Sequence, residues 1–407
     1  ETTIYALTSN AIVKAIDGDS GRTKWSAQVG DPRLPSIGVG SSNDLVAALN
    51  GSTVYCLDAS TGKTLWTKKC RSAPSAPPSV SDGKIFVPLL NGRLETFEQV
   101  ELNVDSDNND LEVGSSDTGK AEKAIRSYAY VSKGRGTARP YVTDVAVAWP
   151  TSNGDLNVAP VYGTRPGVVY QLRSDNAITS APIYRDGQFF TTSLDGFVYA
   201  LDAERGSIDW QISTGHSISQ APISLGNYIF VINDQQQMFK FDAKTGVDAP
   251  GWELPLSNVK RFIGAGKTQM YVIDAVNNLK VINQVSGVVS TVVRVGGVTS
   301  VLPNLQTDRL YVVSDRGMIQ CIREIGSTIP YFHSNEYVAQ TVDPNQPEAD
   351  DATPTNPAGG GTDLDNPFGA SDDPFGGGAK SGAAVPSNPF GGGAKTAKPS
   401  SIEDPFK

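Results

Sequence analysis

Few residues of this 407-residue chain could carry acid–base, nucleophilic or metal chemistry, since it has only two histidines and three cysteines. A serine–histidine or cysteine–histidine arrangement has little to build on, and we expect His216 and His333 to be surface or turn residues. The cysteines, Cys56, Cys70 and Cys321, do not form a disulfide framework, and ordinary thiols are favoured over a Cys56–Cys70 bridge. We therefore predict no catalytic residue and no histidine-based metal site.

One acidic segment is similar to the start of a calcium-binding loop. It runs from Asp105 through Asp107 and Asn109 to Asp110. A calcium loop requires glycine at its sixth position and glutamate at its twelfth, and these positions hold Asp110 and Ser116. We predict a solvated acidic loop without a bound metal.

The strongest signal in the chain is a sequence motif repeated at near-constant spacing. It consists of an apolar run, Asp, three residues, Gly, three residues and Trp. Four copies contain Asp17, Gly21 and Trp25; Asp58, Gly62 and Trp66; Asp202, Gly206 and Trp210; and Asp242, Gly246 and Trp252, the last Trp after a two-residue insertion. A worn copy has Asn283 and Gly287, with Thr291 at the Trp position. A repeat of about 40 residues indicates a repeat architecture.

Each repeat predicts four short strands. Alternating apolar runs are bounded by turn residues, and Asn-Gly or Asp-Gly pairs such as Asn91-Gly92 suit tight hairpins in which both residues have positive φ. In the repeated turn, the Asp carboxylate can accept backbone N–H groups and Gly can adopt a left-handed conformation. The Trp would lie on the outermost strand and cover the gap to the next unit.

The predicted fold is an all-β, eight-bladed β-propeller of four-stranded blades over residues 1–330, with seven blades as the alternative. The first unit lacks an obvious leading strand, and the fourth, around residues 139–175, is degenerate. A polar insertion at about 101–123 accounts for the longer interval between Trp66 and Trp210.

The repeated phrase, clearest at Tyr199–Trp210 and Tyr55–Trp66, resembles the tryptophan-docking repeat of the pyrroloquinoline-quinone-like propeller family. This family contains quinoprotein dehydrogenases and non-enzymatic members, including the lipoprotein propeller of the outer-membrane assembly machine. The resemblance implies that the repeated Asp, Gly and Trp residues dock blades together. The enzymes use an adjacent cysteine pair and a calcium held by Glu, Asn and Asp; this chain has no such pair, so we predict no quinone cofactor.

The negative charge is concentrated at the C-terminal end. Residues 336–407 have a net charge of −7 out of −9 and contain 21 Gly plus Pro. Such a segment is expected to be disordered, because it buries too little apolar surface to offset its ordering entropy. The near-neutral remainder argues against a nucleic-acid partner, and no apolar run is long enough to span a membrane.

The C-terminal segment repeats an [Asn/Asp]-Pro-Phe triplet four times. An Asx-Pro pair favours a turn that presents the following side chain, so each triplet is a candidate weak binding site whose repetition would add avidity. The candidate partner-binding residues are Asn366, Pro367, Phe368, Phe375, Asn388, Pro389, Phe390 and Phe406. An inert spacer is the alternative.

Together these features predict a non-enzymatic, monomeric scaffold that binds proteins through propeller loops, the central funnel and the tail. The alternatives are a quinoprotein-type oxidoreductase and a carbohydrate- or polymer-binding sensor. A chain that starts inside a strand at its first residues resembles a processed or truncated exported protein, so we expect the periplasm or cell envelope.

Overall fold

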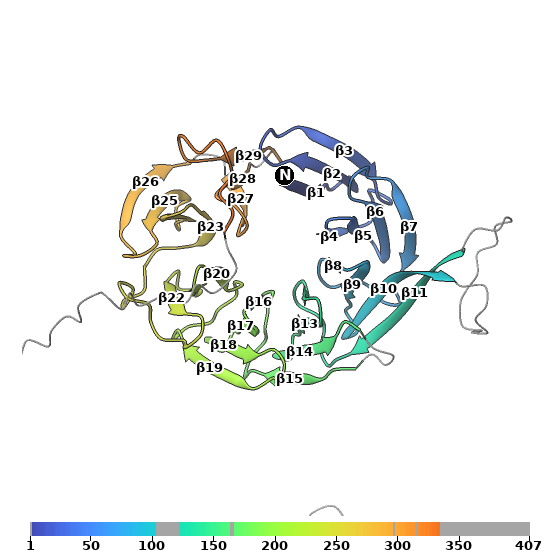
Figure 1. Ribbon diagram of the computed structural model, residues 1–407, viewed down its shortest axis with the longest axis horizontal. Helices are drawn as coiled ribbons and strands as arrows, with labels where there is room; N and C mark the ends of the chain where they lie inside the picture. Colours follow the sequence, from blue (N-terminus) through green and yellow to red (C-terminus); the bar gives the residue numbers. More distant parts are fainter. Residues whose placement is uncertain (1, 103–121, 163–166, 296–297, 315, 334–407) are drawn as a thin grey trace, which may run out of the picture. The chain divides into compact units, whose positions relative to one another are not determined.

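Eight antiparallel sheets are arranged in a ring in the computed structural model (Figure 1), which describes residues 2–102, 122–162, 167–295, 298–314 and 316–333. We number these sheets as blades 1 to 8 in chain order. Blade 1 contains β1 (Thr3–Leu7), β2 (Ile12–Asp17) and β3 (Thr23–Gln28). Blade 2 contains β4 (Ser36–Ser41), β5 (Leu45–Asn50), β6 (Thr53–Asp58) and β7 (Thr64–Lys69). Blade 3 contains β8 (Ser79–Ser81), β9 (Lys84–Pro88), β10 (Arg93–Leu102) and β11 (Glu122–Val131).

The remaining five blades follow the same order. Blades 4 and 5 contain β12 (Tyr141–Val142), β13 (Ala146–Pro150), β14 (Asp155–Pro160) and β15 (Tyr170–Arg173); and β16 (Ile183–Arg185), β17 (Gln188–Thr192), β18 (Phe197–Asp202) and β19 (Ile208–Ser213). Blades 6 to 8 contain β20 (Ile223–Leu225), β21 (Tyr228–Ile232) and β22 (Met238–Asp242); β23 (Arg261–Ala265), β24 (Gln269–Ile273), β25 (Asn278–Asn283) and β26 (Val289–Arg294); and β27 (Val298–Leu302), β28 (Leu310–Ser314) and β29 (Ile319–Ile322).

The predicted eight-bladed propeller is confirmed, and five of the eight blades have four strands within the described residues. Blade 1 has three because no described strand precedes β1, as its sequence indicated. In blade 6, Pro250 and the two-residue insertion break the outermost strand, which is reduced to isolated bridges at Asp248 and Leu256. In blade 8, no described strand follows β29.

The core lies between blades, which explains why the middle strands are apolar on both sides. Side chains alternate across a strand, so in β5 Val46 and Ala48 face blade 1 whereas Ala47 and Leu49 face blade 3. We call the contact between consecutive blades a seam. Seven clusters of buried apolar side chains occupy the seven seams from blade 1 to blade 8. No such cluster occupies the seam between blades 8 and 1 among the described residues.

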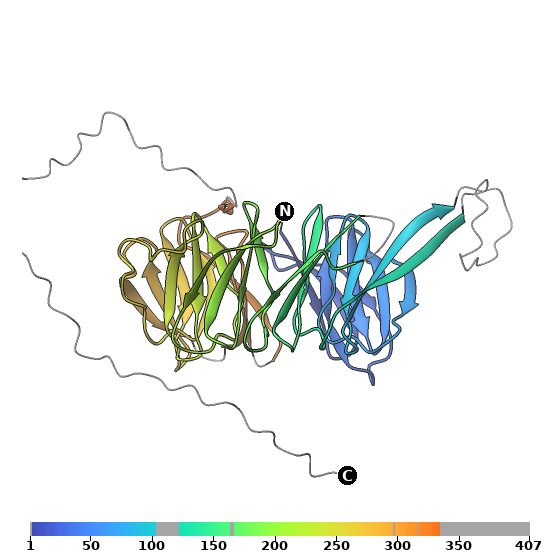
Figure 2. The ribbon, with the colours of Figure 1, turned by 90° about the horizontal axis from the view of Figure 1, so that it is seen from below.

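The polar insertion lengthens one hairpin. β10 and β11 each contain 10 residues and pair along their whole length, from Arg93↔Val131 to Leu102↔Glu122. Figure 2 shows this hairpin extending outward beyond the other blades. Residues 103–121, including the candidate calcium loop, lie outside the described residues.

The Asn-Gly turns are of a different type from the one expected. At Asn91-Gly92 only Gly92 has positive φ, at 79°, and its N–H donates to the Leu89 carbonyl while Leu89 N–H donates to Arg93. This is a three-residue loop, in which a type I turn is followed by a left-handed Gly. Two-residue hairpins with positive φ at both residues occur instead between the first and second strands, as at Asp82-Gly83 (φ 45° and 73°).

Candidate functional site

The repeated turn is held together by its Asp side chain. In blade 2, Asp58 Oδ1 accepts the backbone N–H groups of Ser60 (3.1 Å) and Thr61 (2.8 Å) and both of their hydroxyls. These donors, the Ser60 hydroxyl first, lower the pKa of Asp58 to about 2. The turn closes with Gly62 N–H donating to the Asp58 carbonyl at 2.8 Å, and Gly62 has φ of 72°. Local chemistry therefore determines the shape of this turn.

The neighbouring blade supplies a tryptophan that lies on this turn. Trp25 of blade 1 donates its indole N–H to the Ala59 carbonyl of blade 2 at 2.9 Å. A Cβ added at Gly62 would lie only 2.4 Å from the Trp25 ring. Glycine is thus required twice, by its positive φ and by the ring above it. We call the turn glycine, together with the carbonyl of the residue after the turn Asp, the docking seat.

Three further seams repeat this contact. The donor-to-carbonyl distances are 2.7 Å for Tyr170 to Ala203, 3.0 Å for Trp210 to Ala243 and 3.2 Å for Trp252 to Gln284. A Cβ at the corresponding glycines, Gly206, Gly246 and Gly287, would lie 2.3, 2.7 and 3.2 Å from the covering ring. These contacts support the proposal that the repeated Asp, Gly and Trp residues dock each blade onto the next.

Two tyrosines that the sequence analysis did not select occupy Trp positions. Tyr170 covers the seat of blade 5, and Tyr130 donates its hydroxyl to the Pro160 carbonyl of blade 4 at 2.6 Å. Tyr130, Tyr170 and Trp210 are each 40 residues apart, so the repeat length itself could have found them. A hydroxyl can replace the indole N–H because both are donors on a large apolar ring.

Trp66 and Thr291 depart from the pattern. The long β10–β11 hairpin replaces the turn in blade 3, and Trp66 packs against Phe97 with ring centroids 6.2 Å apart. Thr291, on β26, has no aromatic ring to offer blade 8. Trp25, Trp210 and Trp252 therefore make the same docking contact, whereas Trp66, at the same position of the repeat, does not.

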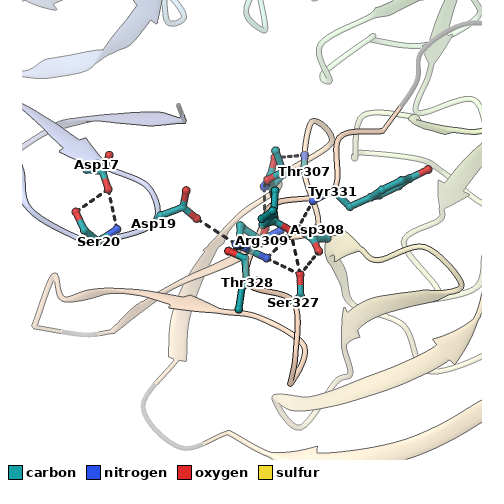
Figure 3. Close-up of polar contacts among 11 residues, drawn as sticks. Asp17, Asp19, Ser20, Thr307, Asp308, Arg309, Ser327, Thr328 and Tyr331 are labelled. Carbon is teal, nitrogen blue, oxygen red and sulfur yellow. Dashed lines mark hydrogen bonds and ion pairs between the residues drawn. The ribbon is translucent and has the colours of Figure 1, made fainter.

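The seam between blades 8 and 1 is joined by a buried arginine (Figure 3). Arg309 is 1% exposed, and its Nε lies 3.1 Å from Asp19 Oδ1 in the repeated turn of blade 1. Its Nη1 lies 3.0 Å from Asp308 Oδ1 and also donates to Ser327 Oγ, and Nη2 donates to the Thr328 carbonyl. Polar contacts thus connect the last blade to the first.

A recess of about 470 Å³ opens between blades 5 and 6. Its lining includes four carboxylates, those of Asp186, Asp202, Glu204 and Asp209, as well as Arg185, Gln188 and Lys244. Arg185 is only 3% exposed; its Nε pairs with Asp186 at 2.9 Å and its Nη1 donates to Ser224 Oγ at 2.8 Å. Its Nη2 is buried and has no hydrogen-bond partner among the described residues. A buried N–H without an acceptor is costly to the folded state.

The remaining candidate residues do not form a site. His216 is exposed in a turn, and His333 Nε2 lies 2.8 Å from the Ala265 carbonyl. All three cysteines are free; burial raises the pKa of Cys56 and of Cys70 to about 12. Among the described residues, no three His, Cys, Asp or Glu side chains are grouped to hold a metal ion. The triplets of residues 366–406 lie outside the described residues.

Sequence comparison identifies relatives for this arrangement of blades. The chain matches the family described as "Outer membrane protein assembly factor BamB" over residues 9–120 and 146–253, more than half of its length. The protein of that name from Moranella endobia (strain PCIT) is 22% identical over 263 residues, which are 60% of this chain and 63% of that protein. The one from Yersinia pestis is 22% identical over 273 residues with the same coverage. The chain thus spans just under two thirds of these curated relatives.

Solved structures show the same fold. BamB from Moraxella catarrhalis superposes with a TM-score of 0.58 at 19% identity, covering 79% of this chain and 91% of that one. The computationally designed Ika8 protein gives a TM-score of 0.58 at 13% identity, covering 80% and 94%. Because a designed protein is as similar as a natural one, these superpositions bear on fold alone. Within the described residues, no helix has the length and hydropathy of a membrane span.

Proposed function

Because the chain belongs to the outer membrane protein assembly factor BamB family, we propose that it is a non-enzymatic scaffold that binds proteins during outer-membrane protein assembly in the cell envelope. The matched residues extend from blade 1 to blade 6 and include the recess between blades 5 and 6. The protein acts by holding partners on a rigid ring, as monomeric propellers can through their loops.

The recess between blades 5 and 6, lined by four carboxylates, is the observation that carries this proposal. These carboxylates favour a basic side chain of a partner protein. The recess therefore fits a protein segment that contains Lys or Arg.

A scaffold role is also supported by the cysteines. A quinoprotein dehydrogenase uses an adjacent cysteine pair, whereas here no two cysteines are adjacent in sequence. Cys56 and Cys70 are buried, and their raised pKa keeps them protonated at neutral pH. Neither thiol lines the recess.

Complementation tests the proposal. In a bacterium lacking its own assembly factor BamB, exported chain should restore the yield of folded outer-membrane proteins. The double variant Glu204→Gln, Asp209→Asn removes two exposed charges of the recess. It should lower the affinity of the chain for a protein segment that contains Lys or Arg about tenfold. Asp44→Asn, an exposed carboxylate on the β4–β5 turn, is the matched control and should have no effect.

Different outcomes contradict different parts of the proposal. Failure of the unmodified chain to restore the yield would argue against a role in assembly. If the double variant restored the yield of folded outer-membrane proteins fully, partners would bind to a surface other than the recess. Retention of pyrroloquinoline quinone after desalting, with alcohol oxidation in the presence of calcium, would favour the oxidoreductase instead.

A further inference from the structure

Two neighbouring turns carry exposed valines at positions that are polar in other copies of the repeat. Val247 and Val288 directly follow the turn glycines of blades 6 and 7, and they are 64% and 61% exposed. The same position holds the exposed residues Arg22, Lys63 and Ser207 in blades 1, 2 and 5. The fold of the turn therefore does not require an apolar residue here.

A third valine lies inside the blade 7 turn. Val285, which is 71% exposed, occupies the second position after the turn Asp or Asn. Blades 1, 2, 5 and 6 have the polar residues Asp19, Ser60, Glu204 and Lys244 at this position. Single exposed apolar residues are ordinary, whereas a group of them marks an interaction site. We call the group formed by Val247, Val285 and Val288 the valine rim.

The valine rim extends from blade 6 to blade 7 without interruption. Gly251 of blade 6 lies against the blade 7 turn, since a Cβ added there would lie 2.9 Å from the Val285 carbonyl oxygen. The next residue, Trp252, covers the glycine that precedes Val288. Val247 is four residues before Gly251, a distance of at most about 14 Å along the chain.

The valine rim also adjoins the recess. Ala243 and Lys244 of the blade 6 turn line the recess, and Val247 follows them in the same turn. The turns between third and fourth strands all lie on one face of the ring, because neighbouring strands of each blade are antiparallel and the blades repeat the same strand order. The path from Lys244 to Val285 is at most roughly 30 Å, which about nine residues of extended chain can span.

We propose that the recess and the valine rim bind one extended segment of a partner protein, in which Lys or Arg residues adjoin large apolar residues. This inference rests on the proposed function of the recess and adds the apolar half of the ligand. The basic side chains would lie among the carboxylates, and the apolar side chains would remove the valines from water.

Charge selects this occupant. The recess has four carboxylates against two cations, Arg185 and Lys244, and Asp248 beside Val247 adds a further acidic group. A basic segment complements such a site. The whole chain has a net charge of −9, and its residues 336–407 account for −7, so neither a second copy nor the C-terminal segment complements the site in net charge.

Two fluorescent peptides test the proposal on the full chain. Both have three central lysines, which are flanked on both sides by leucines in one peptide and by serines in the other. Fluorescence anisotropy should give an affinity about tenfold higher for the leucine peptide, because its apolar side chains cover the valines. Equal affinities of the two peptides would overturn the proposal.

The repeat itself supplies variants that keep the turns intact. The triple variant Val247→Ser, Val285→Ser, Val288→Ser introduces a residue that blades 2 and 5 have at these positions. It should lose the preference for the leucine peptide and bind the serine peptide as before. Val276→Ser is the matched control, because Val276 is 72% exposed in the β24–β25 hairpin on the opposite face of blade 7. The control should keep the preference, and a triple variant that also keeps it would refute the valine rim.

The same measurements identify other occupants. Binding of the leucine peptide that became about tenfold tighter on removal of residues 341–407 would show that the C-terminal segment covers the valines. A dimer in sedimentation equilibrium that the triple variant dissociates would indicate a second copy. Either result would overturn binding of a partner protein.

The recess is tested separately from the valine rim. The double variant Glu204→Gln, Asp209→Asn should weaken both peptides by the same factor of about ten. If it does so while the two peptides bind the unmodified chain equally, only the apolar half of the site is wrong. If it weakens neither peptide, the recess does not bind basic segments, and both proposals fail.

Discussion

Replacing Gly62 by alanine tests whether the turn glycine is required by the covering ring as well as by its own backbone. The added Cβ would lie 2.4 and 2.6 Å from two atoms of the Trp25 ring. A left-handed alanine costs about 1 kcal/mol, displacing the ring adds about 1–3 kcal/mol of overpacking, and loss of the indole hydrogen bond adds about 1 kcal/mol. We expect the free energy of unfolding to fall by about 3–5 kcal/mol.

Gly83→Ala is the control for this measurement. Its φ of 73° matches the 72° of Gly62, and an added Cβ meets nothing within 4 Å. Urea unfolding followed by tryptophan fluorescence should therefore show a loss of only about 1 kcal/mol. If the two variants lose the same stability within about 0.5 kcal/mol, the ring does not restrict Gly62 and the proposed docking role is wrong.

Three further predictions concern charge and the C-terminal segment. Asp58→Asn should retain the turn, because Asn283 accepts the two equivalent N–H groups in blade 7. At neutral pH the unmodified protein should be more stable than this variant. Urea unfolding at a series of pH values should show that this difference in stability disappears as the pH falls from about 4, the pKa of Asp58 in the unfolded chain, through about 2, its pKa in the folded protein. Arg309→Met should lower the free energy of unfolding by about 3–5 kcal/mol, because it leaves the buried Asp308 carboxylate without its cation. Asp19→Asn changes a half-exposed partner of Arg309 and should lower it by only about 0–1 kcal/mol. Equal effects of the two variants in calorimetry would contradict this ranking. Removal of residues 341–407 should leave the thermal midpoint unchanged, and a decrease of several degrees would show that the segment stabilises the propeller.

The sequence alone predicted the features that local chemistry decides. The Asp, Gly and Trp spacing gave eight blades because the turn is made by hydrogen bonds among residues within five positions of each other, which repeat wherever those residues repeat. The sequence also indicated which blades depart from four strands, since it showed that blade 1 lacks an obvious leading strand. The insertion in blade 6 was visible as well.

Contacts between distant residues were decided by the tertiary structure. Trp25 meets Gly62, which is in the next blade, and Arg309 meets Asp19, which is 290 positions away. Among the described residues no ring covers Gly21, although its turn has the same sequence pattern as the covered turns; this difference depends on the place of blade 8 beside blade 1. The unsatisfied Arg185 Nη2 was missed for the same reason, whereas the tyrosines at Trp positions could have been found from their 40-residue spacing. A residue type gives its hydrogen-bonding capacity, whereas its partner depends on how the ring closes.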